Sequence, residues 1–138
     1  MNWSDLNLMP AMPEIVLLAL LGVVLLADLW ICDKNRYLTH LMSLGTVIIV
    51  AVTQLAVWEQ GSVDAFHGMY IADGMSRLAK LVLYALTFGL FIYSKPYNQD
   101  RQIFKGEFYT LSLFALLGMS VMVSSAHFLS AYIGLELL

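Results

Sequence analysis

Four long apolar runs, separated by short polar segments, dominate the pattern of this chain. A helix needs about 20 apolar residues to cross the roughly 30 Å hydrocarbon core of a bilayer, and each run approaches that length. The pattern therefore predicts an all-α, polytopic transmembrane fold, with one transmembrane region over 1–138 and complete helices over 15–32, 38–58, 74–94 and 107–124.

The apolar character continues beyond the fourth run as far as Leu138. One helix from Glu107 to Leu138 would reach about 48 Å, which is too long for a single crossing. We therefore expect a break at 124–127 and an incomplete fifth helix over 127–138. This last segment would rise only about 18 Å, so we expect the natural chain to continue beyond Leu138.

The segment between the second and third runs, residues 59–73, carries turn signals. Gly61 and Gly68 favour turns, and a short hairpin is expected around them. Asp73, directly before the third run, is a suitable N-cap residue for that helix. At the far end of the third run, Lys95 and Pro96 predict that the helix stops at Ser94.

Basic residues are distributed unevenly among the loops. The loops after the first and third runs contain five of them: Lys34, Arg36, Lys95, Arg101 and Lys105. The first 14 residues and the 59–73 loop contain none. The positive-inside rule therefore places the N-terminus and the 59–73 loop outward.

Composition agrees with a membrane chain and excludes several function classes. Hydrophobic residues make up 60% of the chain, charged residues make up 12%, and the mean hydropathy is +0.77. The net charge of −3 and the scattered basic residues exclude a nucleic-acid partner. Cys32 is the single cysteine, and the sequence has no GxGxxG, Walker or metal-ligand motif. We therefore expect no redox chemistry and no bound cofactor or metal in this chain.

Glu136 is the main candidate for chemistry. It stands about nine residues beyond His127, a rise of roughly 13–14 Å that places it near the middle of the hydrocarbon core. An ionisable side chain at that depth needs a partner, a water-filled cavity or a proton. The position predicts a proton carrier, with an interhelical hydrogen bond or an outward tilt as the structural alternatives.

Lys80 and His127 are secondary candidates. Lys80 lies about 9 Å into the third helix, a depth comparable with that of Glu136, so the two side chains could share a polar pathway. Alternatively, Lys80 snorkels outward together with Arg77, because side chains point toward a helix N-terminus. His127 could pass protons at the outer entrance or serve a structural role.

Two further acids have structural explanations. Asp28 lies about one turn from the cytoplasmic end of the first helix, which favours an interfacial role. Glu107 stands at a helix N-terminus, where the macrodipole stabilises a negative charge. His40, His67 and His127 are too far apart for a bis-histidine haem site.

Several short segments resemble one family of membrane subunits. They are EFY at 107–109, LGM at 117–119, SAH at 125–127, GLELL at 134–138 and DG at 73–74. These segments resemble the subunit N family of bacterial NADH-quinone oxidoreductase, respiratory complex I, whose members are antiporter-like membrane subunits. The chain would be the N-terminal part of such a subunit.

The resemblance implies a function that couples electron transfer from NADH to quinone with proton translocation. Glu136 would correspond to the fifth-helix glutamate that faces a lysine on a later helix, outside this sequence. NADH, FMN, iron–sulfur clusters and quinone would be handled by other membrane and peripheral subunits. The chain itself would lie in the bacterial inner membrane with its N-terminus outward.

Two alternatives remain open. A subunit of a Mrp-type cation/proton antiporter or of a hydrogenase complex would share the fifth-helix motif. A structural scaffold would use Glu136 only as a hydrogen-bonding group between helices.

Overall fold

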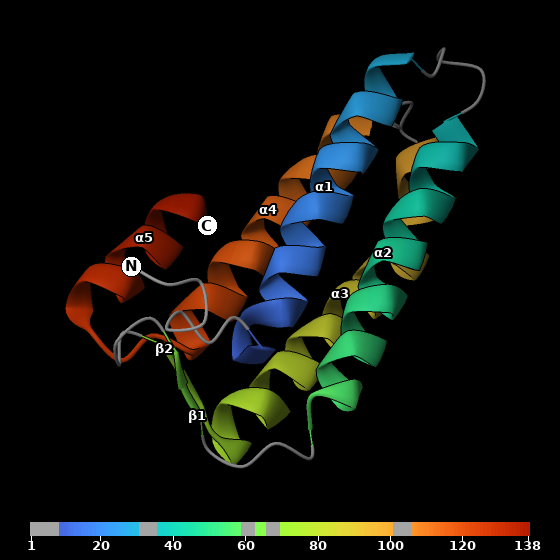
Figure 1. Ribbon diagram of the computed structural model, residues 1–138. Coiled ribbons are helices and arrows are strands. Elements are labelled where there is room, and N and C mark those ends of the chain that lie inside the picture. Colours follow the sequence, from blue (N-terminus) through green and yellow to red (C-terminus); the bar gives the residue numbers. More distant parts are fainter. Residues whose placement is uncertain (1–8, 31–35, 59–62, 66–69, 101–105) are drawn as a thin grey trace.

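The fold is an assembly of apolar helices with one small hairpin (Figure 1). The computed structural model describes residues 9–30, 36–58, 63–65, 70–100 and 106–138. The elements are η2 (Met9–Ala11), α1 (Met12–Trp30), α2 (Arg36–Ala56), β1 (Val63–Ala65), β2 (Tyr70–Ala72), α3 (Gly74–Asp100), α4 (Gly106–Val123) and α5 (Phe128–Leu137). Within these ranges, four helices are long and apolar enough to cross a membrane, and α5 is shorter. The predicted all-α polytopic fold is confirmed.

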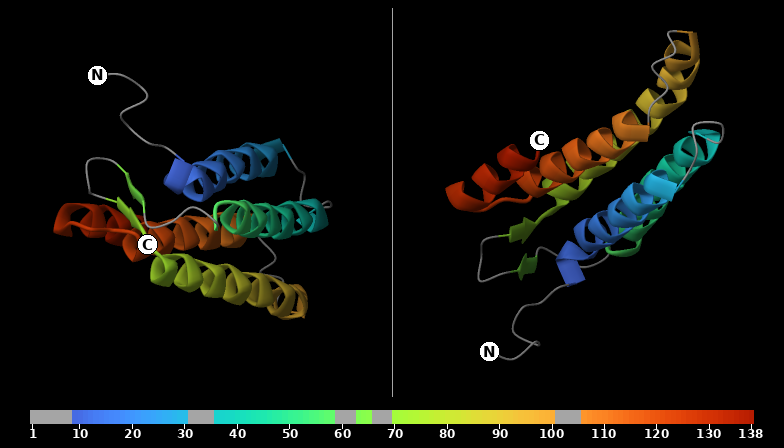
Figure 2. Two further views of the ribbon diagram at one scale, coloured as in Figure 1. Left: turned by 60° about the horizontal axis from the view of Figure 1, so that its bottom comes forward. Right: turned by 90° about the horizontal axis from the view of Figure 1, so that it is seen from above.

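The four long helices form an antiparallel bundle (Figure 1). Helices α1 and α3 each pack against both α2 and α4, which also contact one another. Figure 2 shows the result: α1 and α3 lie on opposite sides of the layer made by α2 and α4. Helix α5 packs against α4, outside the bundle. Side chains from α1 and α3 that meet in the interior must therefore reach across the bundle.

The middle of the bundle contains a large apolar cluster. Its buried cluster is supplied by all four long helices and consists of Leu17, Leu21, Val24, Val47, Val50, Tyr84, Phe91, Tyr109, Leu113, Leu116 and Leu117. The outer surfaces of these helices also carry large apolar side chains, among them Leu26, Val52 and Leu86. Helices that are apolar on all sides are typical of a lipid environment.

The hairpin joins the end of α2 to the start of α3. Strands β1 and β2 pair antiparallel, with Val63 opposite Ala72, which confirms the expected hairpin; Gly61 and Gly68 lie outside the described residues. The backbone N–H of Ile71 donates to the carbonyl of Ser124 at 2.9 Å. The hairpin is thus attached to the turn between α4 and α5. We call this end of the bundle, with the hairpin and the first turns of α1 and α3, the hairpin end.

The third helix is longer than predicted. It continues beyond Ser94, through Pro96, to Asp100. Pro96 has no N–H, so the carbonyl of Ile92 loses its usual helical donor, which is why the sequence favoured a stop there. The candidate membrane span ends at Tyr97. Water at the membrane edge can therefore satisfy that carbonyl, and the helix can continue.

The first helix also begins earlier than predicted, at Met12 rather than at residue 15. Pro13 lies in the first turn, where its missing N–H costs nothing because that N–H has no helical acceptor. Glu14, which the sequence placed before the helix, consequently belongs to α1. Its side chain is held by the helix and buried.

The start of α3 has the expected cap. The backbone N–H of Ser76 donates to Oδ1 of Asp73 at 2.8 Å, and the N–H of Asp73 donates to Oγ of Ser76 at 3.1 Å. These reciprocal bonds satisfy donors that a helix N-terminus leaves open. The hydrogen bonds from Ser76 lower the pKa of Asp73 below its ordinary value of 3.8.

This cap predicts an acid-sensitive contribution to stability. Because the pKa of Asp73 is lower in the folded than in the unfolded state, its contribution is complete above the ordinary value of 3.8 and is lost as the pH falls through the folded value. We expect Asp73→Asn, which can still cap but does not titrate, to reduce the loss of melting temperature on acidification below pH 4. Thermal unfolding at neutral and acidic pH measures this; equal acid sensitivity of the two proteins would contradict it.

Candidate functional site

A buried ion pair joins the two opposite sides of the bundle near the hairpin end. Nζ of Lys80 on α3 contacts Oε1 of Glu14 on α1, and the side chains are only 1% and 8% exposed. Side chains on a helix point toward its N-terminus, so the lysine stem carries its ammonium back to the first turns of the bundle. The snorkelling interpretation is therefore wrong for Lys80. Its ammonium extends in the expected direction but reaches an acid inside the bundle instead of water.

Arg77 lies one turn closer to the hairpin end. Its guanidinium donates from Nη1 to the carbonyl of Trp58 at 2.7 Å and from Nη2 to the carbonyl of Ala72 at 3.3 Å. These bonds tie α3 to the residues after α2 and to β2. Arg77 also interacts electrostatically with Lys80. A second cation thus stands between the ion pair and the hairpin.

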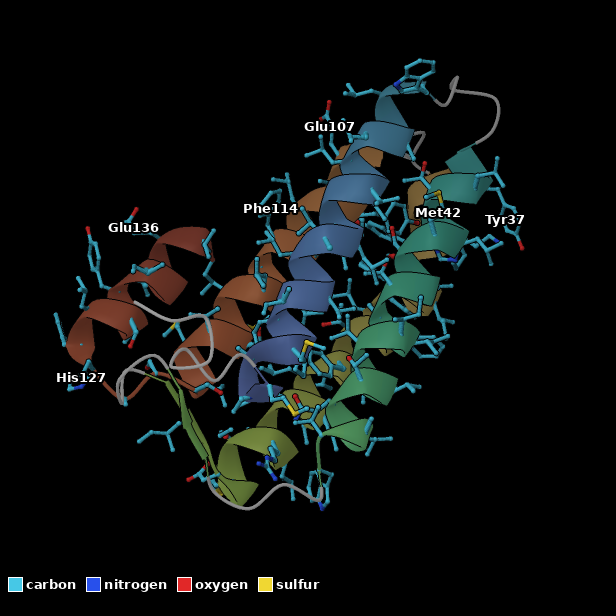
Figure 3. All side chains as sticks on the ribbon, viewed as in Figure 1. Tyr37, Met42, Glu107, Phe114, His127 and Glu136 are labelled. Carbon is cyan, nitrogen blue, oxygen red and sulfur yellow. The ribbon has the colours of Figure 1, made fainter. Side chains whose placement is uncertain are left out.

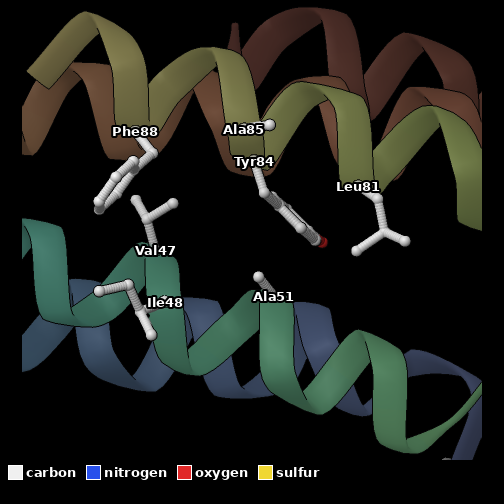
Figure 4. Close-up of a pocket in the computed structure, with 7 residues that line it drawn as sticks. All are labelled: Val47, Ile48, Ala51, Leu81, Tyr84, Ala85 and Phe88. Atoms are coloured by element: carbon white, nitrogen blue, oxygen red, sulfur yellow. The ribbon is translucent and has the colours of Figure 1, made fainter.

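Tyr84 lies one turn from Lys80 on the other side. Its ring is buried in the bundle. It points from α3 toward α2, where it lines an apolar groove of about 280 Å³ together with Val47, Ala51 and Leu81 (Figure 4). The Tyr84 hydroxyl has no hydrogen-bond partner among the described residues.

Gln54 supplies a buried polar group from α2. It lies one turn before Trp58, whose carbonyl accepts from Arg77, and its side chain is 2% exposed. Its Oε1 atom makes no hydrogen bond within the described part of the chain. The hairpin end therefore contains an ion pair, a second cation and polar groups with unused hydrogen-bonding capacity.

A second polar cluster lies at the opposite end of the bundle. The Thr39 hydroxyl donates to Oδ1 of Asp28 at 3.1 Å, and Nδ1 of His40 lies 3.1 Å from the hydroxyl of Tyr109. The Asp28 carboxylate also fills the space beside Gly106, where an added Cβ would be 1.8 Å from Oδ1. These bonds connect α1, α2 and α4, as expected for a structural role of Asp28 near a helix end.

An apolar layer separates the two clusters. Along α1, the residues between Glu14 and Asp28 that face the core are Leu17, Leu21 and Val24, which are at most 2% exposed. The described interior therefore provides no polar connection along α1 between the two ends of the bundle.

Glu136 occupies a different place in the fold. It lies on an exposed face of α5 and points away from the bundle (Figure 3). Lys80 is enclosed between α1 and α3, whereas α5 packs on α4, outside the bundle. The structure therefore does not bring Glu136 and Lys80 together, and the acid partner of Lys80 is Glu14. The role of Glu136 as a proton carrier stays a prediction.

His127 marks the break between α4 and α5, as expected. Its backbone is extended, with φ −123° and ψ 151°, and its side chain forms no cap hydrogen bond. The exposed imidazole lies at the start of α5 (Figure 3). Its carbonyl accepts hydrogen bonds from Ala131 and Ser130 in the first turn of α5. A role in proton entry stays a prediction.

Two glycines fix α5 on α4. A Cβ added to Gly118 would lie 2.7 Å from the carbonyl oxygen of Gly134 and 2.8 Å from the N atom of Leu138. A Cβ added to Gly134 would lie 2.9 Å from the carbonyl oxygen of Gly118. These atoms belong to backbone, so neither helix can accommodate a side chain there without moving. The direction in which Glu136 points thus depends on this contact.

Glu14 is the site residue that sequence reasoning missed. The sequence treated it as a boundary residue before the first helix, whereas it stands two residues inside α1. The signal that could have found it is Lys80, a basic residue inside an apolar run that needs a nearby acid. Among the described residues, no group of three or more His, Cys, Asp and Glu side chains is arranged to hold a metal ion.

The four long apolar helices are those of a multi-pass helical membrane protein. Comparison with known proteins makes this specific. The chain is 73% identical over all of its 138 residues to NADH-quinone oxidoreductase subunit N of Neisseria gonorrhoeae, 49% identical to that of Laribacter hongkongensis and 42% identical to that of Thioalkalivibrio sulfidiphilus. The chain is thus homologous throughout to part of NADH-quinone oxidoreductase subunit N.

The similarity covers the whole of this chain but a limited part of each relative. The chain spans 29% of the length of the Neisseria protein, 28% of the Laribacter protein and 29% of the Thioalkalivibrio protein. No family model matches the sequence.

Proposed function

We propose that this chain is part of a proton-translocating membrane subunit of an NADH-quinone oxidoreductase. The observation that carries the proposal is identity of 73% over the whole chain to a protein named as subunit N of that enzyme. Four helices of spanning length agree with a membrane subunit of that enzyme. Partner subunits would hold NADH, FMN, the iron–sulfur clusters and the quinone.

Glu136 is the proposed proton carrier. Its side chain is turned away from α1–α4, so it is available to groups that this chain does not contain. A lysine that approaches the carboxylate would stabilise its charged form and release the proton, and withdrawal of the lysine would favour uptake. Changes in the electron-transferring subunits would drive that movement, so the coupling is electrostatic and conformational.

The proposed location is a bacterial inner membrane, with the hairpin end outward. Among the described residues, Lys95 supports this orientation. Its ammonium lies 4.4 Å from the ring centroid of Tyr37 at the end opposite the hairpin. Lys34, Arg101 and Lys105 lie outside the described residues. By the positive-inside rule, a basic cluster at that end supports a cytoplasmic location for it.

The test is Glu136→Gln in the intact complex, which removes the ionisable proton and keeps the size of the side chain. We expect normal assembly and at least a several-fold loss of proton pumping per NADH oxidised, measured in membrane vesicles. Glu107→Gln is the matched control: it also removes an exposed acid from a helix, but one whose position is explained by the α4 N-terminus. Full pumping by an assembled Glu136→Gln complex would overturn the proposed role.

Purification separates this proposal from its alternatives. Co-isolation with NADH-oxidising subunits supports a complex I subunit. Isolation with a hydrogenase, or cation/proton exchange without NADH-oxidising subunits, supports the related transport complexes. A scaffold would retain pumping in every assembled Glu136 variant.

A further inference from the structure

We propose that the Glu14–Lys80 ion pair is a second proton-exchange site of this chain, separate from Glu136 and open toward the hairpin end of the bundle. The inference rests on the proposed function, because it assigns to the same translocating subunit a further group that binds a proton. It is carried by the placement of the pair: two charges from opposite sides of the bundle meet inside it, next to a buried apolar cluster that all four long helices supply.

A purely structural role explains the pair poorly. Removing two ions from water carries a large desolvation penalty, and well-packed apolar side chains of similar volume are often as stable or more stable. The bundle already has an extensive apolar core between the pair and the end opposite the hairpin, so its helices do not need an ion pair to hold them together. Buried ionisable groups within membrane helices are typical of proton and ion pathways.

The chemistry needs one proton and no electrons. A proton that arrives from the hairpin end forms an O–H bond on the Glu14 carboxylate, which leaves a carboxylic acid beside the Lys80 ammonium. Loss of that O–H proton restores the ion pair. Direct transfer from Nζ to Oε1 breaks an N–H bond and forms an O–H bond, so that both groups become neutral and the net charge of the pair is unchanged.

The surroundings suit temporary protonation. Arg77 lies one turn from Lys80 and interacts with it electrostatically, so an additional positive charge on the pair is repelled and the bound proton can leave. Tyr84 and Gln54 present a buried hydroxyl and a buried carboxamide oxygen that have no hydrogen-bond partner within the described residues.

The direction of access follows from the apolar layer. Leu17 and Leu21 cover the side of Glu14 that faces the middle of the bundle, and each is at most 2% exposed. On the other side lie Arg77 and the backbone of the hairpin connection. The short route for a proton therefore leads to the hairpin end, and Glu14 and Lys80 exchange with the aqueous phase on that side.

The test separates transport from folding by neutralising both partners together. The variant Glu14→Leu/Lys80→Met keeps an apolar contact at this position, and Glu14→Lys/Lys80→Glu keeps an ion pair with its charges exchanged. Both are compared with wild type in the assembled complex, by proton pumping per NADH oxidised in vesicles. We expect the apolar variant to lose at least half of the pumping per NADH, and the exchanged pair to retain more pumping than the apolar variant.

An apolar variant that assembles and pumps as wild type would overturn the inference, because a structural contact alone would then be sufficient. Where it does not assemble, infrared difference spectra of the oxidised and NADH-reduced wild-type complex replace it. A carboxylic-acid band that is absent from the Glu14→Gln complex supports the site, and identical spectra overturn it. Glu136→Gln is measured in parallel: its normal pumping would reject the proposed function, whereas its loss of pumping with an unaffected apolar pair would reject this inference alone.

Discussion

Replacing Lys80 alone by methionine is expected to destabilise the protein by about 3–5 kcal/mol, because a buried carboxylate on Glu14 then loses its cation. The cost arises from the place of the pair, which is almost fully enclosed. In the variant Glu14→Leu/Lys80→Met no uncompensated charge remains, so we expect most of the loss to disappear. Thermal unfolding of the detergent-extracted protein and its amount in the membrane measure both effects.

Lys95→Met provides the control for the loss of a lysine. The Lys95 ammonium lies over the Tyr37 ring and is only half-buried, so its removal should cost no more than about 1 kcal/mol. If the double variant were as unstable as Lys80→Met, the destabilisation would come from packing around the lysine stem. If Lys80→Met were as stable as Lys95→Met, the charge of Glu14 would be compensated by other groups.

The features that could be predicted from the sequence are those that depend on interactions between residues close together in the chain. Apolar runs of spanning length must form helices in lipid, because each backbone N–H and C=O needs a partner within the segment. The break near His127 could be placed from length alone, because a single helix as far as Leu138 would be too long for one crossing. Asp73 could be identified as a cap because it directly precedes the third apolar run. The extension of α3 through Pro96 was missed because it depends on where the membrane ends relative to the helix.

The candidate site was harder to predict because pairing depends on the arrangement of helices. Depth along the sequence made Lys80 and Glu136 comparable, but depth does not say which helices are neighbours. The packing of α5 outside α4 separates these residues, whereas the diagonal position of α1 and α3 lets the long lysine stem reach Glu14. The early start of α1 at Met12 completes the arrangement.

The contact between α4 and α5 predicts the other large effect, that of Gly118→Ala. The added methyl group would lie 2.7 Å from the carbonyl oxygen of Gly134 and 2.8 Å from the N atom of Leu138. Because these atoms are backbone, α5 must move away from α4. We expect a cost of about 1–3 kcal/mol, as for other overpacked interiors.

Moving α5 also reorients Glu136, so Gly118→Ala should lower proton pumping even in complexes that assemble, which vesicle assays per NADH oxidised would measure. Gly89→Ala is the matched control, since a Cβ at Gly89 meets no atom within 4 Å. Alanine there favours the helix by about 0.5–1 kcal/mol and should leave pumping unchanged. If Gly118→Ala and Gly89→Ala had the same stability and the same pumping, the close approach of α4 and α5 would not determine the position of Glu136. A selective loss in Gly118→Ala would connect that helix contact directly to proton transfer.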